Sequence, residues 1–529
     1  MLRLIATRRH KHRYQAAKMK YEDTISLING LEATLPVATW RVHGVQMWPV
    51  IRSRLLCHVF DDALGDVLQH SGTLKRISRR AGAATRSMGS TIRNALRGAS
   101  PGSAADVVIV TDGVATTRLQ GQAFDVVADP LAEVISATGL KVRTWYTTYA
   151  CPEPRHTDGV LVQWRLDTAQ LAKVFDRRWI REESTDPAGY AEFLEALRVA
   201  GVAHEAVAVE RVAGLASRIA LMATRFETWL HAASPRLVFV NCYYSLEGAA
   251  LMLACKRCGI MSIDMQHGVQ GNLHFAYGAW ANVPHEGYDL LPDRFWCWSE
   301  TEVRTIRSWT DERNGHHVPM LGGNLWLDMW RDEGAALVKT SNEAVGAIVR
   351  IGTCVVLVTL QWGMTDETFL DPLIKLMVDA GESWTWWIRL HPVMSTRRGE
   401  IAQMLLRRGL KHALIDEPSD IALPALLRHA GVHLTHSSSA TLEAAEFGVA
   451  TVVASSYGAA CFPELVRDGV VMAVESLSSE VALPALLAQS TRRRKNSVRT
   501  AGPAIAVLND LLARTTARPQ GSVAMGGGA

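Results

Sequence analysis

The chain has 529 residues, 48% of them hydrophobic and 20% charged, with a formal net charge of +4. This length predicts two domains rather than one core. No run of about 18 or more uncharged apolar residues occurs, so we expect no transmembrane helix. The N-terminal segment lacks the apolar stretch and cleavage site of a secretory signal, which predicts a cytoplasmic protein.

The eight cysteines are scattered through the chain, as expected for reduced thiols rather than a disulfide framework. Cys255 and Cys258 form the one closely spaced pair, in the sequence CKRC, and no second pair stands at a zinc-ribbon spacing. Both fall late in an apolar helical pattern. We therefore expect them to pack a helix, and we expect neither a metal site nor a cofactor.

Residues 1–100 carry 17 Lys and Arg against 6 Asp and Glu, so the rest of the chain is net acidic. They lack alternating strand patterns and are predicted to be helical, with residues 39–64 the best candidate for a packed segment. Two interpretations of the charge stay open: contact with an anionic inner-membrane surface, or a solvated helical extension. No nucleic-acid-reading motif accompanies the charge, so we expect no nucleic-acid partner.

A segment rich in Gly, Ser and Pro near residue 100 separates the predicted helical region from a region in which strands and helices alternate. Residues 106–113 predict a strand, residues 124–139 a helix and residues 141–148 a second strand, which together make a βαβ unit. Residues 150–233 are predicted to be mainly helical. Strands then follow at 236–244, 261–268, 293–300 and 316–324, with a helix at 245–259. The last of these strands is expected to leave the domain toward a linker.

The second half of the chain repeats the alternation of strand and helix more regularly. Its strands are predicted at 353–363, 384–392, 412–416, 432–438 and 449–456. Short apolar strands separated by helices predict a parallel sheet covered on both faces. The fold class is therefore predicted to be α/β, with two Rossmann-like, doubly wound domains facing a cleft.

Polar residues stand where the predicted strands end, which is where such domains bind ligands. They are Asp112, His267, Gln361, His391 with Pro392, and the run His436, Ser437, Ser438 and Ser439.

The serine run directly precedes a predicted helix that carries Glu443. Serine hydroxyls and the first-turn amides of a helix predict a phosphate-binding site. Ordinary N-capping is the alternative, and it needs only one serine. We expect Glu443 either to return a hydrogen bond to the cap or to bind a ligand hydroxyl.

His391 ends a strand rich in tryptophan, and Pro392 stops further ladder pairing there. We expect His391 to donate to a phosphate oxygen, with a purely structural role as the alternative. No Gly-rich phosphate loop or dinucleotide fingerprint follows a predicted strand, which disfavours nucleoside triphosphate hydrolysis and nicotinamide chemistry. Imidazoles and hydroxyls at one sheet edge instead favour stabilisation of a departing nucleotide phosphate.

The densest polar and aromatic stretch of the first half begins at residue 261. His267 leaves a buried strand, and Gly268 is expected to adopt a positive φ or to permit close ligand approach. His267 and Asp112 are the candidates for a base that deprotonates an acceptor hydroxyl, although Asp112-Gly113 is also ordinary turn chemistry. The residues predicted to bind the acceptor are Gln266, Gly268, His274 and Tyr277.

Over about residues 105–510, these motifs resemble bacterial surface-polysaccharide glycosyltransferases of the GT-B type. QHG at 266–268, followed by an aromatic loop and LLPDRFWCWSE, is similar to the acceptor half of capsule and lipopolysaccharide transferases. HP at 391–392 and the serines of THSSS are similar to motifs of bacterial sialyltransferases and Kdo transferases, which bind the phosphate of a CMP-sugar. The resemblance implies that His391 contacts the nucleotide phosphate and that Ser437 to Ser439 hold it.

The segment TDGV at 111–114 lacks the second acidic residue of that family's general-base motif. The pattern SSSATLEAAEFG is also similar to transferases that use UDP-, GDP- or TDP-sugars, so the nucleotide stays open. The resemblance implies metal-independent, inverting transfer of a sugar from a nucleotide-sugar donor, with a CMP-sugar favoured, to an envelope, capsular or lipid-linked glycan. The alternatives are a CDP-glycerol-type polyol-phosphate transferase, a sugar-nucleotide epimerase and a non-catalytic scaffold for polysaccharide assembly.

The predicted organisation has four parts. They are a basic, mainly helical extension at 1–104, an acceptor domain at 105–330, a nucleotide-sugar domain at 331–514 and a disordered tail at 515–529.

Overall fold

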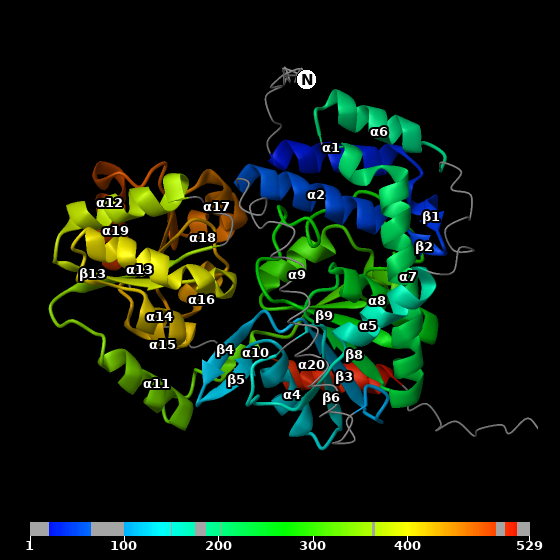
Figure 1. Ribbon diagram of the computed structural model, residues 1–529, viewed down its shortest axis with the longest axis horizontal. Coiled ribbons are helices and arrows are strands. Elements are labelled where there is room, and N and C mark those ends of the chain that lie inside the picture. The colour runs from blue at the N-terminus through cyan, green and yellow to red at the C-terminus, as the bar shows by residue number, and fades with distance from the viewer. Residues whose placement is uncertain are drawn as a thin grey trace, which may run out of the picture.

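The structure is a computed structural model that describes residues 21–64, 100–149, 151–174, 187–202, 204–361, 366–492 and 503–515. Within these ranges the chain forms two Rossmann-like domains, each built on a parallel sheet with helices packed against it (Figure 1). The predicted α/β class, with two Rossmann-like parallel-sheet domains, is confirmed.

The first domain contains a seven-stranded sheet in the order β11-β10-β9-β8-β3-β6-β7. Its strands are β3 (Val107–Thr111), β6 (Val142–Tyr146), β7 (Gly159–Leu161), β8 (Leu237–Val240), β9 (Met261–Met265), β10 (Arg294–Cys297) and β11 (Val318–Leu321). The pairings are parallel, and the strand order reverses between β3 and β8. Such a reversal opens a crevice at the carboxyl ends of the strands.

Helices cover both faces of this sheet. They are α4 (Ala128–Ser136), α5 (Gln163–Val174), α6 (Tyr190–Val199), α7 (Val209–Ala233), α8 (Leu246–Cys258) and α9 (Glu300–Arg307), with 3-10 turns η2 (His204–Val207) and η3 (Glu312–Asn314). Ser245 caps α8 by accepting the Gly248 amide hydrogen, and Gly259 ends the helix with a φ of +62°. Cys255 and Cys258 lie on α8 and are buried in the core, which confirms that they pack this helix.

Several elements of the first domain differ from the prediction, among them β7, which lies in the segment 150–233 that was predicted to be mainly helical. A hairpin of β4 (Thr116–Leu119) and β5 (Gln122–Asp125) precedes α4, so the predicted helix begins later than residue 124. The carboxylate of Asp125 accepts the amide hydrogens of Val127 and Ala128, both at 3.0 Å, and this fixes the helix start. The strand at 318–321 does not leave the domain, because it pairs with β10 as the edge of the sheet.

The second domain contains a six-stranded parallel sheet in the order β14-β13-β12-β15-β16-β17. Its strands are β12 (Cys354–Thr359), β13 (Trp384–Arg389), β14 (Ala413–Leu414), β15 (Val432–Thr435), β16 (Thr451–Val453) and β17 (Val471–Ala473). The order reverses between β12 and β15. Gln361, His391 and the serine run therefore follow three adjacent strands at one edge of the sheet.

The helices of the second domain alternate with these strands. They are η4 (Asp366–Leu370), α12 (Asp371–Ala380), η5 (Pro392–Arg397), α13 (Arg398–Arg407), α14 (Asp416–Asp420), α15 (Leu423–His429), α16 (Ala440–Glu446), α17 (Ser456–Cys461), α18 (Pro463–Arg467) and α19 (Ser479–Ser490).

Two helices, α10 (Leu325–Asp328) and α11 (Ala336–Gly346), connect the domains. Trp326 packs in one buried cluster with Phe124 of the first domain and Trp387 of the second. The last described helix, α20 (Ala504–Arg514), returns to the first domain (Figure 1). Its Leu508 and Leu511 pack against the first sheet, whereas the predicted boundary placed residues 331–514 in the second domain.

The N-terminal region is part of the first domain's core. It comprises α1 (Tyr21–Thr34), η1 (Val37–Thr39), a short ribbon of β1 (Arg41–Val42) and β2 (Val45–Gln46), and α2 (Trp48–Leu64). Trp40 and Trp48 are fully buried in the same cluster as residues of α7 and α8. The expectation of a packed segment is confirmed for residues 40–56, and the ribbon is an element that was not predicted.

A buried arginine holds α2 against the loop that follows β9. Arg52 is 1% exposed, pairs with Glu32 of α1 at 3.3 Å, and donates to the carbonyl oxygens of Phe275 and Ala279. Its guanidinium also lies 4.6 Å from the ring centroid of Trp280. The N-terminal helices therefore fix the loop beside the site described below.

No helix among the described residues combines the length and apolar character needed to cross a membrane. The predicted membrane contact of the basic segment and the predicted disordered tail fall largely on residues 1–20, 65–99 and 516–529. These residues lie outside the described ranges.

Candidate functional site

Two cavities lie between the domains. The larger, called the interdomain cavity, has a volume of about 850 Å³ and is walled by the segment after β9, α9 and α10 of one side and by α16 and α18 of the other. The smaller, called the neck cavity, has a volume of about 110 Å³ and shares Trp298, Gly323, Asn324 and Glu443 with the larger. Arg304 of α9 pairs with Glu464 of α18 at 2.7 Å, which ties the two walls together.

The neck cavity brings together residues predicted from different halves of the chain. His267, at the end of β9, lines it from the first domain, while Ser439 and Glu443 line it from the second. These residues follow strands whose carboxyl ends face across the domain boundary. The structure thus places one predicted base candidate beside two predicted donor-binding residues.

The protonation state of His267 follows from its neighbours. Its Nδ1 lies 3.1 Å from the carbonyl oxygen of Met265, which can only accept, so Nδ1 carries the hydrogen. The other nitrogen, Nε2, lies 2.9 Å from the hydroxyl of Tyr244 and accepts from it. Burial lowers the pKa of His267, although the Asp112 carboxylate acts in the opposite direction. A neutral imidazole with a lone pair on Nε2 is suited to accept a proton.

Asp112 lies at the reversal point of the first sheet but is used in a turn. Its Oδ1 accepts the amide hydrogen of Val114 at 3.0 Å and a hydrogen from the Asn241 side chain at 3.2 Å. It is not among the residues that line the interdomain or neck cavity. The contacts present are those of the Asp-Gly turn, and its charge reaches His267 electrostatically.

Glu443 lies on α16 and lines both cavities. Burial raises the pKa of its carboxyl to about 7, and the nearby guanidinium of Arg389 opposes this effect. In the described structure its carboxylate accepts no hydrogen bond from the helix start, and the side chain of Ser439 makes no capping bond. Of the two predicted roles, the position of Glu443 suits a ligand hydroxyl rather than the cap.

The serine run is largely occupied by its own turn. The amide and hydroxyl of Ser437 both donate to Oε1 of Gln361, at 2.9 and 3.2 Å, and the hydroxyl of Ser438 accepts from the amide of Ala440. The amides of Thr441 and Leu442 donate to carbonyl oxygens within the same turn.

His436 has its own local contacts. Its Nδ1 lies 3.1 Å from the hydroxyl of Ser437, and its ring packs edge-on against Phe369. Neither His436 nor Ser437 nor Ser438 is among the residues that line the two cavities, whereas Ser439 lines the neck cavity. The contact from Ala440 to Ser438 is that of the capping alternative, whereas Ser437 is held by Gln361 at the end of β12.

His391 caps a turn at the end of β13. Its Nδ1 accepts the amide hydrogen of Val393 at 3.3 Å, and Pro392 begins the 3-10 turn η5. Burial lowers its pKa, which favours a neutral ring. It stands at the same sheet edge as Gln361 but is not among the residues that line the two cavities.

The residues predicted to bind the acceptor are mostly used inside the first domain. The buried amide of Gln266 donates to the carbonyl of Gly268 at 2.9 Å and accepts from the amide of Trp298 at 2.6 Å, so it clamps β9 to β10 where it lines the neck cavity. Gly268 does not adopt a positive φ, so that expectation was wrong, and a Cβ there would meet open space; close approach of a ligand at Gly268 stays a prediction.

Tyr277 and His274 are parts of a buried aromatic cluster. Tyr277 donates to the Asp264 carboxylate at 2.7 Å, and burial raises the pKa of that carboxyl to about 8. His274 stacks on Phe275, and burial lowers its pKa to about 3. Neither residue is among those that line the interdomain or neck cavity.

Gln270 is a candidate site residue that the sequence analysis missed. Its side chain is 1% exposed and lines the interdomain cavity. Neither its Oε1 nor its Nε2 has a hydrogen-bond partner among the described residues. A buried amide without hydrogen-bond partners is costly, so a polar ligand in the cavity would supply the hydrogen bonds that the protein does not. The only sequence signal was its place two residues after Gly268, in the segment QHGVQG.

No group of three or more His, Cys, Asp or Glu side chains in the described ranges is arranged to hold a metal ion.

Comparison with known proteins gives likeness of structure alone. No protein-family model and no curated protein matches the chain. The UDP-GlcNAc 2-epimerase of Methanocaldococcus jannaschii in complex with UDP-GlcNAc and UDP aligns over 77% of this chain and 99% of its own, at 13% identity and a TM-score of 0.47. The S. aureus MnaA–UDP co-structure aligns over 78% of this chain and 96% of its own, at 11% identity and a TM-score of 0.45. The spinosyn rhamnosyltransferase SpnG aligns over 77% of this chain and 96% of its own, at 12% identity and a TM-score of 0.40.

Proposed function

We propose that this chain is a glycosyltransferase that binds a nucleotide sugar between its domains and transfers the sugar to a hydroxyl group. The observation that carries the proposal is the convergence of His267, Glu443 and Gln270 on two cavities that share a wall. The interdomain cavity, at about 850 Å³, has the size of a small-molecule site. It also lies at the strand ends where doubly wound domains bind ligands.

The sugar of the donor is proposed to lie in the neck cavity, between His267 and Glu443. Its nucleotide would extend into the interdomain cavity, where hydroxyl or carbonyl groups pair with the amide of Gln270. The phosphate is proposed to lie near Ser439, with Gln361 and His391 at the adjacent sheet edge. The resemblance favours a CMP-sugar, and a panel of nucleotides decides the base.

The proposed transfer uses the lone pair of His267. As the acceptor oxygen bonds to the anomeric carbon, its proton passes to the Tyr244 hydroxyl, whose own hydrogen passes to Nε2 of His267, and the bond from that carbon to the phosphate oxygen breaks. The carbonyl of Met265 holds the Nδ1 hydrogen, so the lone pair of the ring lies on Nε2, where it accepts the hydroxyl hydrogen of Tyr244. Single displacement of this kind inverts the anomeric carbon. The nucleotide leaves with the electron pair of the broken bond.

Sugar-nucleotide epimerisation is the second candidate. One observation favours it: two titratable groups with displaced pKa values, His267 and Glu443, flank one cavity of only about 110 Å³. Removal and return of a proton on one sugar needs two such groups and no acceptor. Product analysis separates the candidates, because an epimerase returns an isomeric nucleotide sugar while a transferase releases the nucleotide.

The test is calorimetric titration of the full chain with CMP-, CDP-, UDP-, GDP- and TDP-linked sugars, followed by product analysis of whichever donor binds. We expect one base to be preferred, and we expect Gln270→Leu to weaken its binding. Gln403→Leu, on the exposed face of α13, is the matched control and should bind like the unmodified chain. Absence of binding by every nucleotide would contradict the proposal and favour a non-catalytic scaffold.

A further inference from the structure

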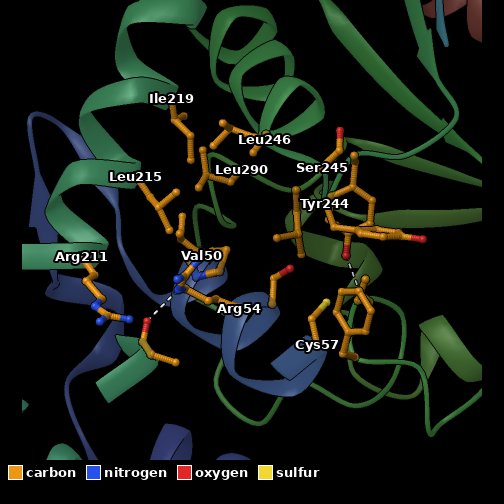
Figure 2. Close-up of a pocket in the computed structure, with 18 of the residues that line it drawn as sticks. Val50, Arg54, Cys57, Arg211, Leu215, Ile219, Tyr244, Ser245, Leu246 and Leu290 are labelled. Atoms are coloured by element: carbon orange, nitrogen blue, oxygen red, sulfur yellow. Dashed lines mark hydrogen bonds between the residues drawn. The ribbon is translucent and has the colours of Figure 1, made fainter. Parts of the chain in front are cut away.

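A third cavity, called the apolar pocket, lies inside the first domain beside the proposed site. Its volume is about 480 Å³, and α2, α7, the start of α8 and the loop after β9 form its walls (Figure 2). On α7 the lining residues Arg211, Leu215 and Ile219 recur at every fourth position, so they occupy one face of the helix. Other lining residues are Val50, Cys57, Leu246, Phe275, Trp280, Leu290 and Leu291.

One end of the apolar pocket carries positive charge. Arg54 and Arg211 lie together there, away from Tyr244 and Ser245 (Figure 2). Neither guanidinium forms an ion pair within the described part of the chain, and Arg54 donates only to the carbonyl of Ala206, at 2.6 Å. Glu205 lines the same pocket, but its Oε1 lies 3.7 Å from Nε2 of His204. An anionic group at this end would meet two available donors.

At its opposite end, the apolar pocket is separated from the neck cavity by the hydrogen-bonded pair Tyr244 and His267. Tyr244 forms part of the pocket wall, and its hydroxyl lies 2.9 Å from Nε2 of His267. His267 in turn lines the neck cavity. A hydroxyl group at this end of the pocket would therefore meet the tyrosine whose hydroxyl is hydrogen-bonded to the proposed base.

We propose that the apolar pocket binds the acceptor, and that this acceptor is an amphiphile with an apolar body, an anionic group at Arg54 and Arg211, and a reacting hydroxyl at Tyr244. This assignment rests on the proposed glycosyltransferase function. The acceptor oxygen bonds to the anomeric carbon while the carbon–phosphate oxygen bond breaks. The hydroxyl proton passes to the Tyr244 oxygen, and the Tyr244 hydrogen passes to Nε2 of His267.

The lining argues against a glycan body in this pocket. A sugar chain would bring many hydroxyl groups, and each one buried without a partner is costly. The middle of the pocket offers aliphatic and aromatic carbon instead, from residues such as Leu215, Ile219 and Leu246. Apolar contact over this stretch, with charge at one end, matches a fatty or polycyclic hydroxy acid or its phosphate counterpart.

The binding test uses dodecanoate, dodecyl phosphate and dodecan-1-ol below their micelle concentrations, titrated calorimetrically into the full chain without nucleotide. We expect both anions to bind about tenfold more tightly than the alcohol, as for a hydrogen bond to a charged group. The stronger of the two anions identifies the carboxylate or the phosphate as the preferred head group. Equal affinity for the alcohol and the anions would overturn the proposal.

Two variants and a control locate the binding. The double variant Arg54→Gln with Arg211→Gln should remove the preference for anions, whereas Arg225→Gln, an exposed arginine on the same helix, should keep it. Leu215→Trp should fill the pocket and weaken all three probes. If the double variant and Arg225→Gln behave alike, or if Leu215→Trp leaves affinity unchanged, the probes bind elsewhere and the proposal fails.

The acceptor role is tested separately with ω-hydroxydodecanoate and the preferred nucleotide sugar. Formation of the glycoside, detected by mass spectrometry and lost in Leu215→Trp, supports the assignment. Binding of a nucleotide sugar without binding of any amphiphile overturns the pocket assignment while leaving the transferase standing. If amphiphiles bind but no nucleotide sugar does, the ligand class of the pocket is supported and the proposed transfer is overturned.

Discussion

Tyr244 donates its phenolic hydrogen to Nε2 of His267 across 2.9 Å, and this bond joins a pocket inside the first domain to the cavities between the domains. The tautomer is set from the other side, where the carbonyl of Met265 holds the hydrogen of Nδ1. His267 is therefore a preorganised acceptor rather than a freely rotating side chain. Such preorganisation is what a general base requires.

His267→Ala should lower turnover by about 10²- to 10⁴-fold, the usual contribution of general-base catalysis. Nucleotide affinity should change little, because the imidazole is proposed to act on the acceptor. Steady-state kinetics together with calorimetry measure the two effects separately. His285→Ala, in the exposed part of the same loop, is the matched control. Equal turnover in both variants would remove His267 from the reaction.

Gln270→Leu should stabilise the ligand-free protein by about 1 kcal/mol while weakening nucleotide binding. The reason is that the variant removes a buried amide whose two polar atoms have no partner in the described structure. Thermal unfolding with and without nucleotide measures both changes. A loss of stability without nucleotide would mean that the amide is satisfied by the protein and is not reserved for a ligand.

Glu443 should make stability decrease as the pH rises. Burial raises the pKa of its carboxyl from 4.5 to about 7, so the folded state binds more protons than the unfolded state between these values. The stability contributed by the protonated carboxyl is complete below pH 4.5 and is lost as the pH rises through about 7. Urea unfolding at several pH values should show this loss in the unmodified chain and a flatter profile in Glu443→Gln. Parallel profiles would contradict the raised pKa.

Arg52→Met should destabilise the first domain by about 3 to 5 kcal/mol, the usual cost of removing one partner of a buried ion pair and leaving the other charge uncompensated. The variant would leave the buried carboxylate of Glu32 without its charged partner. It would also remove the hydrogen bonds through which Arg52 holds the loop at Phe275 and Ala279. Denaturant unfolding measures the loss, with the exposed Arg225→Met as the control. A change below about 1 kcal/mol, the range of a surface pair, would show that the N-terminal helices are not needed for the core.

The sheets could be predicted because their strands are short apolar runs between helical periods, as in Val107–Thr111 and Cys354–Thr359. The three-residue strands β7 and β17 give too little pattern to stand out. The burial of Trp40 and the return of α20 to the first sheet depend on partners distant in sequence, which no local pattern encodes.

The candidate site was predictable in part for a related reason. Position at a strand end pointed to His267 and, through the following helix, to Glu443. The same rule selected His391 and Ser437, but it does not tell which strand-end groups are already hydrogen-bonded within the protein. Gln270 escaped because its lack of partners arises only when the two domains bury it.

The central claim is that the cavities between the domains hold the donor. A crystal structure of the chain with the nucleotide sugar preferred in calorimetry tests this most directly. We predict that its sugar lies between His267 and Glu443, with Gln270 paired to its nucleotide. A donor bound outside both cavities, with Gln270 still without a partner, would contradict the account.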